Sequence, residues 1–132
     1  MLKYPSIAVD FDGTLGYSSH RDYPKITKVF KYPIKVLNEY KAKGGVCILW
    51  TCRSGIDVDI VVDELKKYGL EFDAVNKNTD EINQAWLKDH PDAQISTKIS
   101  TSLYIDDKAY GIHPHKLDWK RIKKFILQEV DI

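Results

Sequence analysis

The sequence has little cysteine and no long hydrophobic run. Its two cysteines, Cys47 and Cys52, do not form a CxxC pair, which argues against a disulfide framework and against a thiolate metal site. No apolar stretch approaches the length of a membrane span, and residues 1–5 lack the apolar core of a secretory signal. We therefore expect a soluble protein of the cytoplasm.

An excess of charge of one sign is also lacking, because 20 Lys and Arg residues face 19 Asp and Glu residues, for a formal net charge of +1. A chain with so small a net charge has no electrostatic preference for nucleic acid or for a membrane surface, so neither is an expected partner. Glycine (7) and proline (5) are too few for a collagen-like or low-complexity chain. With 132 residues, 43% of them hydrophobic, we expect one compact domain over 1–132.

Short apolar runs alternate with amphipathic stretches along the chain. Continuous apolar runs are typical of buried parallel strands, which we expect at 7–9, 46–50, 72–75 and 103–105. Helical spacing of apolar residues predicts helices at 33–43, 54–69, 79–90 and 119–130. In the second of them Ser54 is the expected N-cap, and Gly69 ends the helix. In the third of these, Ile82, Ala85 and Trp86 are expected to face the core. The alternation predicts an α/β fold, a three-layer α/β/α sandwich with a central parallel sheet.

Acidic residues follow two of the predicted strands. Ligands of such sheets bind beyond the carboxyl ends of the strands, and DFDGT (10–14) and DD (106–107) stand at two of these ends. If the two strands are neighbours, up to four carboxylates share one rim, and their repulsion favours proton uptake or a divalent cation. Oxygen ligands without a nearby His or Cys favour Mg²⁺. The candidate metal ligands are therefore Asp10, Asp12, Asp106 and Asp107.

The strand at 46–50 is followed by Thr51-Cys52-Arg53, which offers a hydroxyl, backbone N–H groups ahead of a helix and a guanidinium. These donors suit a phosphate group. Taken singly, Thr51 is more often a cap and Arg53 a surface ion pair, but together with the carboxylates they favour phosphate binding. Cys52 is expected to be a spacer between them rather than a nucleophile.

Three stretches at strand ends, in this order, carry a resemblance to a known family. IAVDFDGTL (7–15) resembles the first motif of haloacid dehalogenase-like hydrolases, WTCR (50–53) the second and LYIDD (103–107) the fourth. The resemblance spans residues 7 to 107 and implies a Rossmann-like core and a phosphoaspartyl mechanism. It implies that Asp10 is the nucleophile and that Asp12 is the general acid and base.

The resemblance further implies that Mg²⁺ binds the Asp10 side chain, the Asp12 backbone carbonyl and Asp106, with Asp107 as a further or water-mediated ligand. The dehalogenase branch of the family lacks an acid at the position of Asp12, so its presence favours phosphate esters over carbon–halogen bonds. The expected activity is that of a Mg²⁺-dependent phosphomonoesterase. The substrate is not identified, and nucleotides and sugar phosphates are the candidates.

The third family motif is a lysine that screens the nucleophile and the phosphate, and its usual Lys-Pro signature is missing here. Lys98, eight residues before Asp106, resembles the lysine of deoxyribonucleotidase-like members and is favoured over Lys77. The stretches between the motifs are too short for a cap domain. We therefore expect an uncapped site, with the loop at 15–32 as a mobile flap and a second subunit of a homo-oligomer as a candidate cover.

Two other classes of function stay open. A signalling receiver domain also phosphorylates an aspartate at a strand end, although it carries an acidic pair on its first strand and the acceptor on a later one. A module that binds phosphate or a phosphoprotein without catalysis is the second. His113-Pro114-His115 is interpreted as a loop in preference to a pair of metal ligands.

Overall fold

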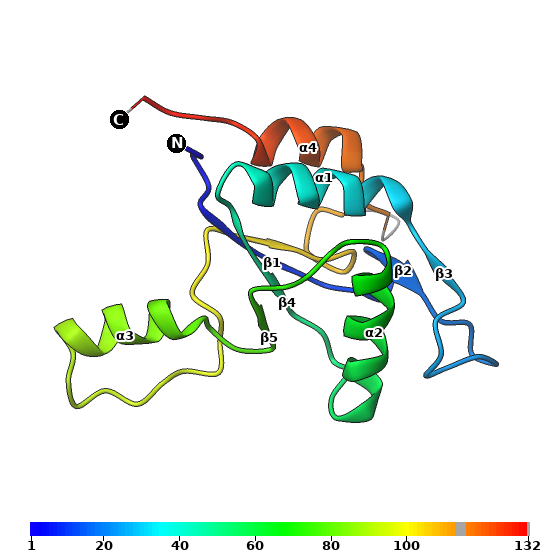
Figure 1. Ribbon diagram of the computed structural model, residues 1–132, viewed down its shortest axis with the longest axis horizontal. Coiled ribbons are helices and arrows are strands. Elements are labelled where there is room, and N and C mark those ends of the chain that lie inside the picture. The colour runs from blue at the N-terminus through cyan, green and yellow to red at the C-terminus, as the bar shows by residue number, and fades with distance from the viewer. Residues whose placement is uncertain (113–115, 132) are drawn as a thin grey trace.

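A parallel sheet lies at the centre of the computed structural model, which describes residues 1–112 and 116–131 (Figure 1). The interpretation of His113-Pro114-His115 therefore lies outside the described residues. The sheet has the order β5-β4-β1-β6 and consists of β1 (Ser6–Val9), β4 (Val46–Leu49), β5 (Ala74–Val75) and β6 (Leu103–Ile105). After β1 the chain forms a small antiparallel hairpin of β2 (Gly16–Tyr17) and β3 (Lys28–Val29). The predicted α/β fold with a central parallel sheet is confirmed.

The register of the sheet places the ends of three strands at one level. Val9 pairs with Leu49 of β4 and with Ile105 of β6, so all three strands end side by side. The pairing continues for one residue, because the amide of Asp10 donates to the carbonyl of Ile105 at 3.0 Å. Asp10 and Asp106 therefore leave the sheet at neighbouring positions of the same edge.

Four helices accompany the sheet: α1 (Lys31–Ala42), α2 (Ile56–Lys67), α3 (Asp80–Asp89) and α4 (Trp119–Ile126). Thr79 caps α3, since its hydroxyl accepts the amide of Ile82 at 3.3 Å. The prediction of Ser54 as the N-cap of α2 is wrong by one residue: Gly55 takes this place, at a φ of 56°. Within the part of the chain that the structure describes, no helix has the length and apolarity needed to cross a bilayer.

The two faces of the sheet are covered unequally. Ile7 and Val9 of β1 face a large apolar cluster to which α1, α2 and α4 contribute, and α1 lies beside α4 in Figure 1. Ala8, on the opposite face, belongs to a small cluster with Ile48, Ala74 and Ile99. The layer on this second face is therefore thin, and much of it is supplied by the segment that leads into β6.

Helix α3 reaches this thin layer only at its start. Ile82 packs against the small cluster, but the rest of the helix extends away from the sheet in Figure 1. Trp86 is 54% exposed, and Ala85 is exposed as well. The prediction that these two residues face the core is wrong, because the helix leaves the sheet after its first turn.

Candidate functional site

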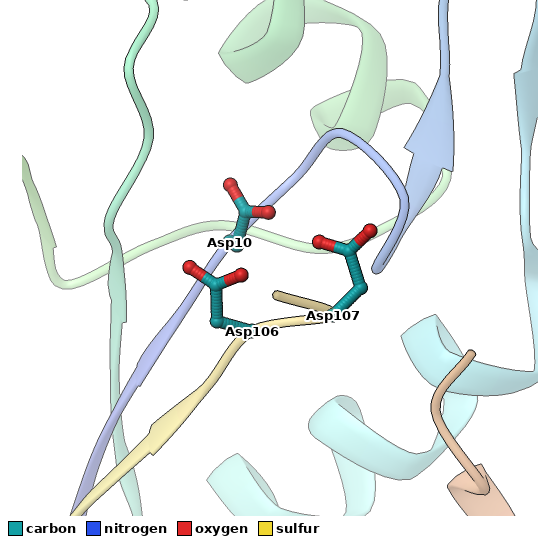
Figure 2. Close-up of side chains that lie close together, drawn as sticks. All are labelled: Asp10, Asp106 and Asp107. Atoms are coloured by element: carbon teal, nitrogen blue, oxygen red, sulfur yellow. The ribbon is translucent and has the colours of Figure 1, made fainter. Parts of the chain in front are cut away.

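Three carboxylates converge at the edge where β1 and β6 end. Asp10 follows β1, and Asp106 and Asp107 follow β6, which is its neighbour in the sheet. Each of the three offers one oxygen, and these oxygens all lie within 4.8 Å of one another (Figure 2). Such a set of oxygen ligands suits a hard divalent cation. The expected neighbourhood of the DFDGT and DD motifs is thus realised by the parallel pairing of their strands.

Gly13 allows Asp107 to lie against the loop that follows β1. Gly13 has a φ of 83°, and a Cβ at this position would stand 2.2 Å from Oδ2 of Asp107. The loop is closed by the Gly13 amide, which donates to the carbonyl of Gly16 at 2.8 Å, and the indole of Trp119 donates to the carbonyl of Thr14. The glycine of the motif therefore serves the close approach of a carboxylate, and Asp107 is only 7% exposed.

In this carboxylate triad of Asp10, Asp106 and Asp107, burial and neighbouring charge disfavour ionisation of Asp10 and Asp107. Burial, followed by the charges of Asp106, Asp107 and Asp12, raises the pKa of Asp10 to about 7, although an amide hydrogen bond from Phe11 partly opposes this. The pKa of Asp107 is also raised, by burial first and by Asp106 second. A bound cation would relieve both effects, because it reverses the sign of the local field.

The side chain of Asp12 lies apart from the triad and is paired with Arg53. Oδ2 accepts a hydrogen bond from Nε of Arg53 at 2.9 Å, and Oδ1 accepts one from Nη2 at 2.8 Å. The Asp12 side chain is nevertheless 43% exposed. The predicted metal role of Asp12 is not one for its carboxylate in this geometry, whereas the role of its backbone carbonyl stays a prediction.

Arg53 is enclosed by the hairpin instead of facing open solvent. It is 3% exposed; its Nη1 donates to the carbonyl of Pro24 at 2.7 Å, and its Nη2 donates to Oγ of Ser18 at 2.8 Å. Together with the pair to Asp12, four of the five guanidinium N–H groups are directed at protein oxygens. The predicted phosphate ligand thus has protein partners, and phosphate binding by its fifth N–H stays a prediction.

Thr51 is held in place by Asn76, a residue that the sequence reasoning missed. The amide of Thr51 donates to Oδ1 of Asn76 at 2.8 Å, and Nδ2 of Asn76 donates to the carbonyl of Arg53 at 3.0 Å. The Thr51 hydroxyl accepts the amide of Arg53 at 3.2 Å, and within the described part of the chain its own hydrogen has no acceptor, so it can be donated to a ligand. The one sequence signal for Asn76 is its place directly after the weak strand β5, at the edge that carries the other site residues.

The two candidate lysines stand on segments that lie side by side. Asn78 Oδ1 accepts the amide of Ser100 at 2.7 Å, so the chain around Lys77 is tied to the chain around Lys98. Both lysines are exposed, and among the residues that the structure describes neither forms an ion pair with a carboxylate of the site. The preference for Lys98 over Lys77 stays a prediction.

The loop at 15–32 is a hairpin fastened to the beginning of α2. The ring of Tyr23 lies 4.6 Å from the Arg53 guanidinium carbon, and its hydroxyl donates to Oδ2 of Asp57 at 3.3 Å. The segment expected to be a flap is therefore held in place through Tyr23. It does not seal the site, because Asp10 remains partly exposed.

Comparisons with known proteins place the chain beside proteins whose names state no activity. No protein-family model and no curated protein matches it. Among solved structures, a conserved protein from Bacteroides thetaiotaomicron is 34% identical over 92% of this chain and 88% of that one, with a TM-score of 0.71. A hypothetical protein from Xanthomonas campestris is 20% identical over 80% of this chain and 55% of that one, with a TM-score of 0.43.

Proposed function

The chain belongs to the same family as the conserved protein from Bacteroides thetaiotaomicron, and from the site that it carries we propose a Mg²⁺-dependent phosphomonoesterase of the haloacid dehalogenase-like type. The observation that carries the proposal is the convergence of Asp10, Asp106 and Asp107, with the Asp12 carboxylate held apart from them by Arg53. Three carboxylates suit a cation, and a fourth beside them is left for proton transfer. Phosphoryl transfer with acid–base help needs both.

The triad fits a hard divalent cation by its chemistry. Its ligand atoms are all carboxylate oxygens, and the pKa of Asp10 is raised to about 7, by burial first and then by the charges of the neighbouring carboxylates. Asp10, Asp106 and Asp107 would hold the ion. Mg²⁺ in this place would shield an incoming phosphate from the Asp10 charge and stabilise the oxygens in transfer.

In the first half of the proposed reaction an Asp10 carboxylate oxygen attacks the phosphorus of the ester. The bond from phosphorus to the leaving oxygen breaks, and Asp12 donates a proton to that oxygen, which departs as an alcohol. The Thr51 hydroxyl donates a hydrogen bond to a phosphate oxygen, and Lys98, with Lys77 as its rival, balances the charge of the phosphate. The product of this half is a phosphoaspartate on Asp10.

In the second half a water molecule attacks the phosphorus of the phosphoaspartate. Asp12, which gave up its proton in the first half, accepts one from this water. The bond between phosphorus and the Asp10 oxygen breaks, and inorganic phosphate leaves. Asp10 is returned as a carboxylate and Asp12 in its protonated form, so the cycle is balanced.

The hairpin covers Arg53 but leaves Asp10 accessible, which suits a substrate larger than a free phosphate ion. The proposed substrates are phosphate monoesters in the cytoplasm, with nucleotides and sugar phosphates as the classes to test first. A second copy of the chain is the proposed cover where a substrate needs a closed site.

Turnover of p-nitrophenyl phosphate with Mg²⁺ and with a chelator tests the proposal. The wild-type protein should release nitrophenol only with Mg²⁺, and Asp10→Asn should fall to the background rate because it lacks the nucleophile. Asp63→Asn, which removes an exposed carboxylate of α2, is the matched control and should keep full activity.

The two other classes predict different outcomes of the same experiment. Binding of phosphate without turnover on any monoester would replace the proposal with a binding module. A phosphoaspartate on Asp10 that persists for minutes to hours would replace it with a receiver-like protein. Either outcome, with a folded wild-type protein, would overturn the hydrolase.

A further inference from the structure

Among the described residues Arg53 is the most deeply buried cation near the site, and the proposed reaction assigns it no step. A buried charge is costly unless it is paired and hydrogen-bonded, so its partners show what holds it there. On one side its Nε and Nη2 bind both oxygens of Asp12. On the other side it binds the hairpin, through the Ser18 hydroxyl and the Pro24 carbonyl.

We propose that Arg53 is a positioning residue, which fixes the orientation of the Asp12 carboxylate for proton transfer and makes that orientation depend on the seating of the hairpin at 16–29. The inference rests on the proposed function and adds to it a residue that acts through Asp12. It also gives the hairpin a part in the chemistry.

The two-point contact determines the plane of the carboxylate. A guanidinium fork that binds both oxygens leaves a carboxylate little freedom to rotate, which a single donor does not achieve. Each Asp12 oxygen keeps a second lone pair, and the side chain is 43% exposed, so the face turned from Arg53 is open to a leaving group or to water. Proton transfer needs heavy atoms within about 2.6–3.2 Å, so this orientation is a condition for it.

Two aromatic rings lie against the fork. The guanidinium carbon lies 5.3 Å from the ring centre of Phe11 and 4.6 Å from that of Tyr23. Tyr23 is in turn bound to Asp57 at the start of α2. Any shift of the hairpin moves Tyr23, Ser18 and Pro24 together, and the fork with them. The orientation of Asp12 is thereby tied to the segment that an approaching substrate meets.

Leaving-group dependence separates this role from a structural one. General acid help matters most for a poor leaving group, so kcat/KM, which reports the steps up to the departure of the leaving group, is measured on phenyl phosphate and on p-nitrophenyl phosphate. Arg53→Lys keeps the charge but loses the fork. It should lower kcat/KM on phenyl phosphate by about 10- to 100-fold more than on p-nitrophenyl phosphate, the range expected for a misplaced proton donor. A residue that only stabilised the fold would lower both rates by one factor.

A double-variant comparison tests whether Arg53 acts through Asp12. Asp12→Asn should show the same preferential loss on phenyl phosphate. Adding Arg53→Lys to Asp12→Asn should then cause no further preferential loss, because the group to be positioned is already gone. An equal preferential loss in both backgrounds would overturn the inference.

Because Arg53 is buried, Arg53→Lys can prevent folding, and a variant in the hairpin therefore provides a second test of the proposal. Ser18→Ala removes one acceptor of Nη2, but the buried Arg53 stays paired with Asp12. It should shift the leaving-group ratio in the same direction as Arg53→Lys does, by about two- to fivefold. Lys28→Ala, on the same hairpin and with an exposed side chain that does not contact Arg53, is the matched control. Circular dichroism shows whether Arg53→Lys is folded, and the leaving-group ratio of Ser18→Ala replaces that of Arg53→Lys where it is not.

The outcomes distinguish the two proposals. A folded wild-type protein without Mg²⁺-dependent turnover on either ester would overturn the proposed function, and this inference with it. Turnover by the wild-type protein with an unchanged leaving-group ratio in folded Arg53→Lys, or in Ser18→Ala in its place, would overturn the positioning role alone.

Discussion

Gly13 and Asp107 lie so close together that a Cβ on the glycine would stand 2.2 Å from Oδ2 of the carboxylate. Cβ atoms do not make contacts of this length, so a side chain at this position has to displace either the loop after β1 or Asp107 itself. Since Asp107 belongs to the carboxylate triad, the glycine of the DFDGT motif is tied to the triad rather than only to a turn.

Gly13→Ala should therefore weaken Mg²⁺ binding as well as the fold. Displacement of Asp107 should lower the Mg²⁺ affinity by about tenfold or more, a size typical of changes in the groups that orient metal ligands. The strain of an alanine at a φ of 83° adds a loss of about 1 kcal/mol or more in the free energy of unfolding. Mg²⁺ titration by calorimetry and thermal unfolding measure the two effects.

Gly44→Ala is the matched control for this prediction. Gly44 has a similar φ of 92°, but an added Cβ there meets nothing within 4 Å. It should lose stability by a comparable strain and bind Mg²⁺ as the wild-type protein does. Equal Mg²⁺ affinity in both variants would show that Asp107 tolerates the Cβ and that the metal role of this contact is wrong.

The raised pKa of Asp10 predicts how the response to Mg²⁺ changes with pH. A carboxyl whose pKa rises on folding from 3.8 to about 7 lowers the stability of the metal-free protein as pH rises through this interval, because the folded state holds its proton more tightly than the unfolded state. Mg²⁺ competes with that proton. The rise in Tm on adding Mg²⁺ should therefore be clearly larger at about pH 8 than at about pH 5.

Thermal unfolding across this pH range, with Mg²⁺ and with a chelator, measures the effect. Asp10→Asn removes one of the titrating groups and should show a smaller Mg²⁺ response with a weaker pH dependence, to which the raised pKa of Asp107 still contributes. A wild-type response that is larger at the acidic end would contradict the coupling between proton and metal at Asp10.

The carboxylate site was largely predictable from the sequence, because its residues directly follow apolar runs. Asp10 and the pair Asp106-Asp107 are each one step beyond a strand, and parallel pairing of β1 with β6 is enough to bring them together. The sequence could not show this pairing itself, since order along the chain does not fix order in the sheet. The prediction of the site therefore assumed that β1 and β6 are neighbours in the sheet, and the observed register confirms this assumption.

The partners of Arg53 were not predictable, because the hairpin that supplies them has strands of two residues each. Strands this short carry no period-2 pattern, so Ser18 and Pro24 had no signal that would place them over a guanidinium. For helix α3 the sequence did carry a pattern, but the prediction drawn from it was partly wrong. Its apolar spacing is helical, as predicted, but spacing states only that Ile82 and Trp86 share a side, not that the sheet reaches both of them.

Substitution of the two candidate lysines should separate them by their effect on phosphate. Lys98→Ala should raise KM for p-nitrophenyl phosphate and the Ki for inorganic phosphate by about tenfold or more, since a charged hydrogen bond to the phosphate is lost. Lys77→Ala should change both by less than about twofold, as expected for a solvated lysine. Steady-state kinetics with inorganic phosphate as a competitive inhibitor give the comparison. The reverse order of effects would transfer the role to Lys77.

The hairpin should affect selectivity through its exposed residues and chemistry through the residues that contact Arg53. Ser18, Tyr23 and Pro24 contact Arg53, whereas His20 and Arg21 are exposed and form no side-chain hydrogen bond or ion pair with the residues that the structure describes. Replacing His20-Arg21 with Gly-Ser should leave kcat on p-nitrophenyl phosphate within about twofold, while KM for a larger monoester such as a nucleoside monophosphate changes by about threefold or more. Tyr23→Leu, which removes the ring over the guanidinium, should instead lower kcat on poor leaving groups. A panel of aryl, sugar and nucleoside phosphates measured on both variants tests this division. Loss of kcat on the activated ester from the His20-Arg21 replacement would contradict it, because it would give the exposed residues a part in the chemistry as well.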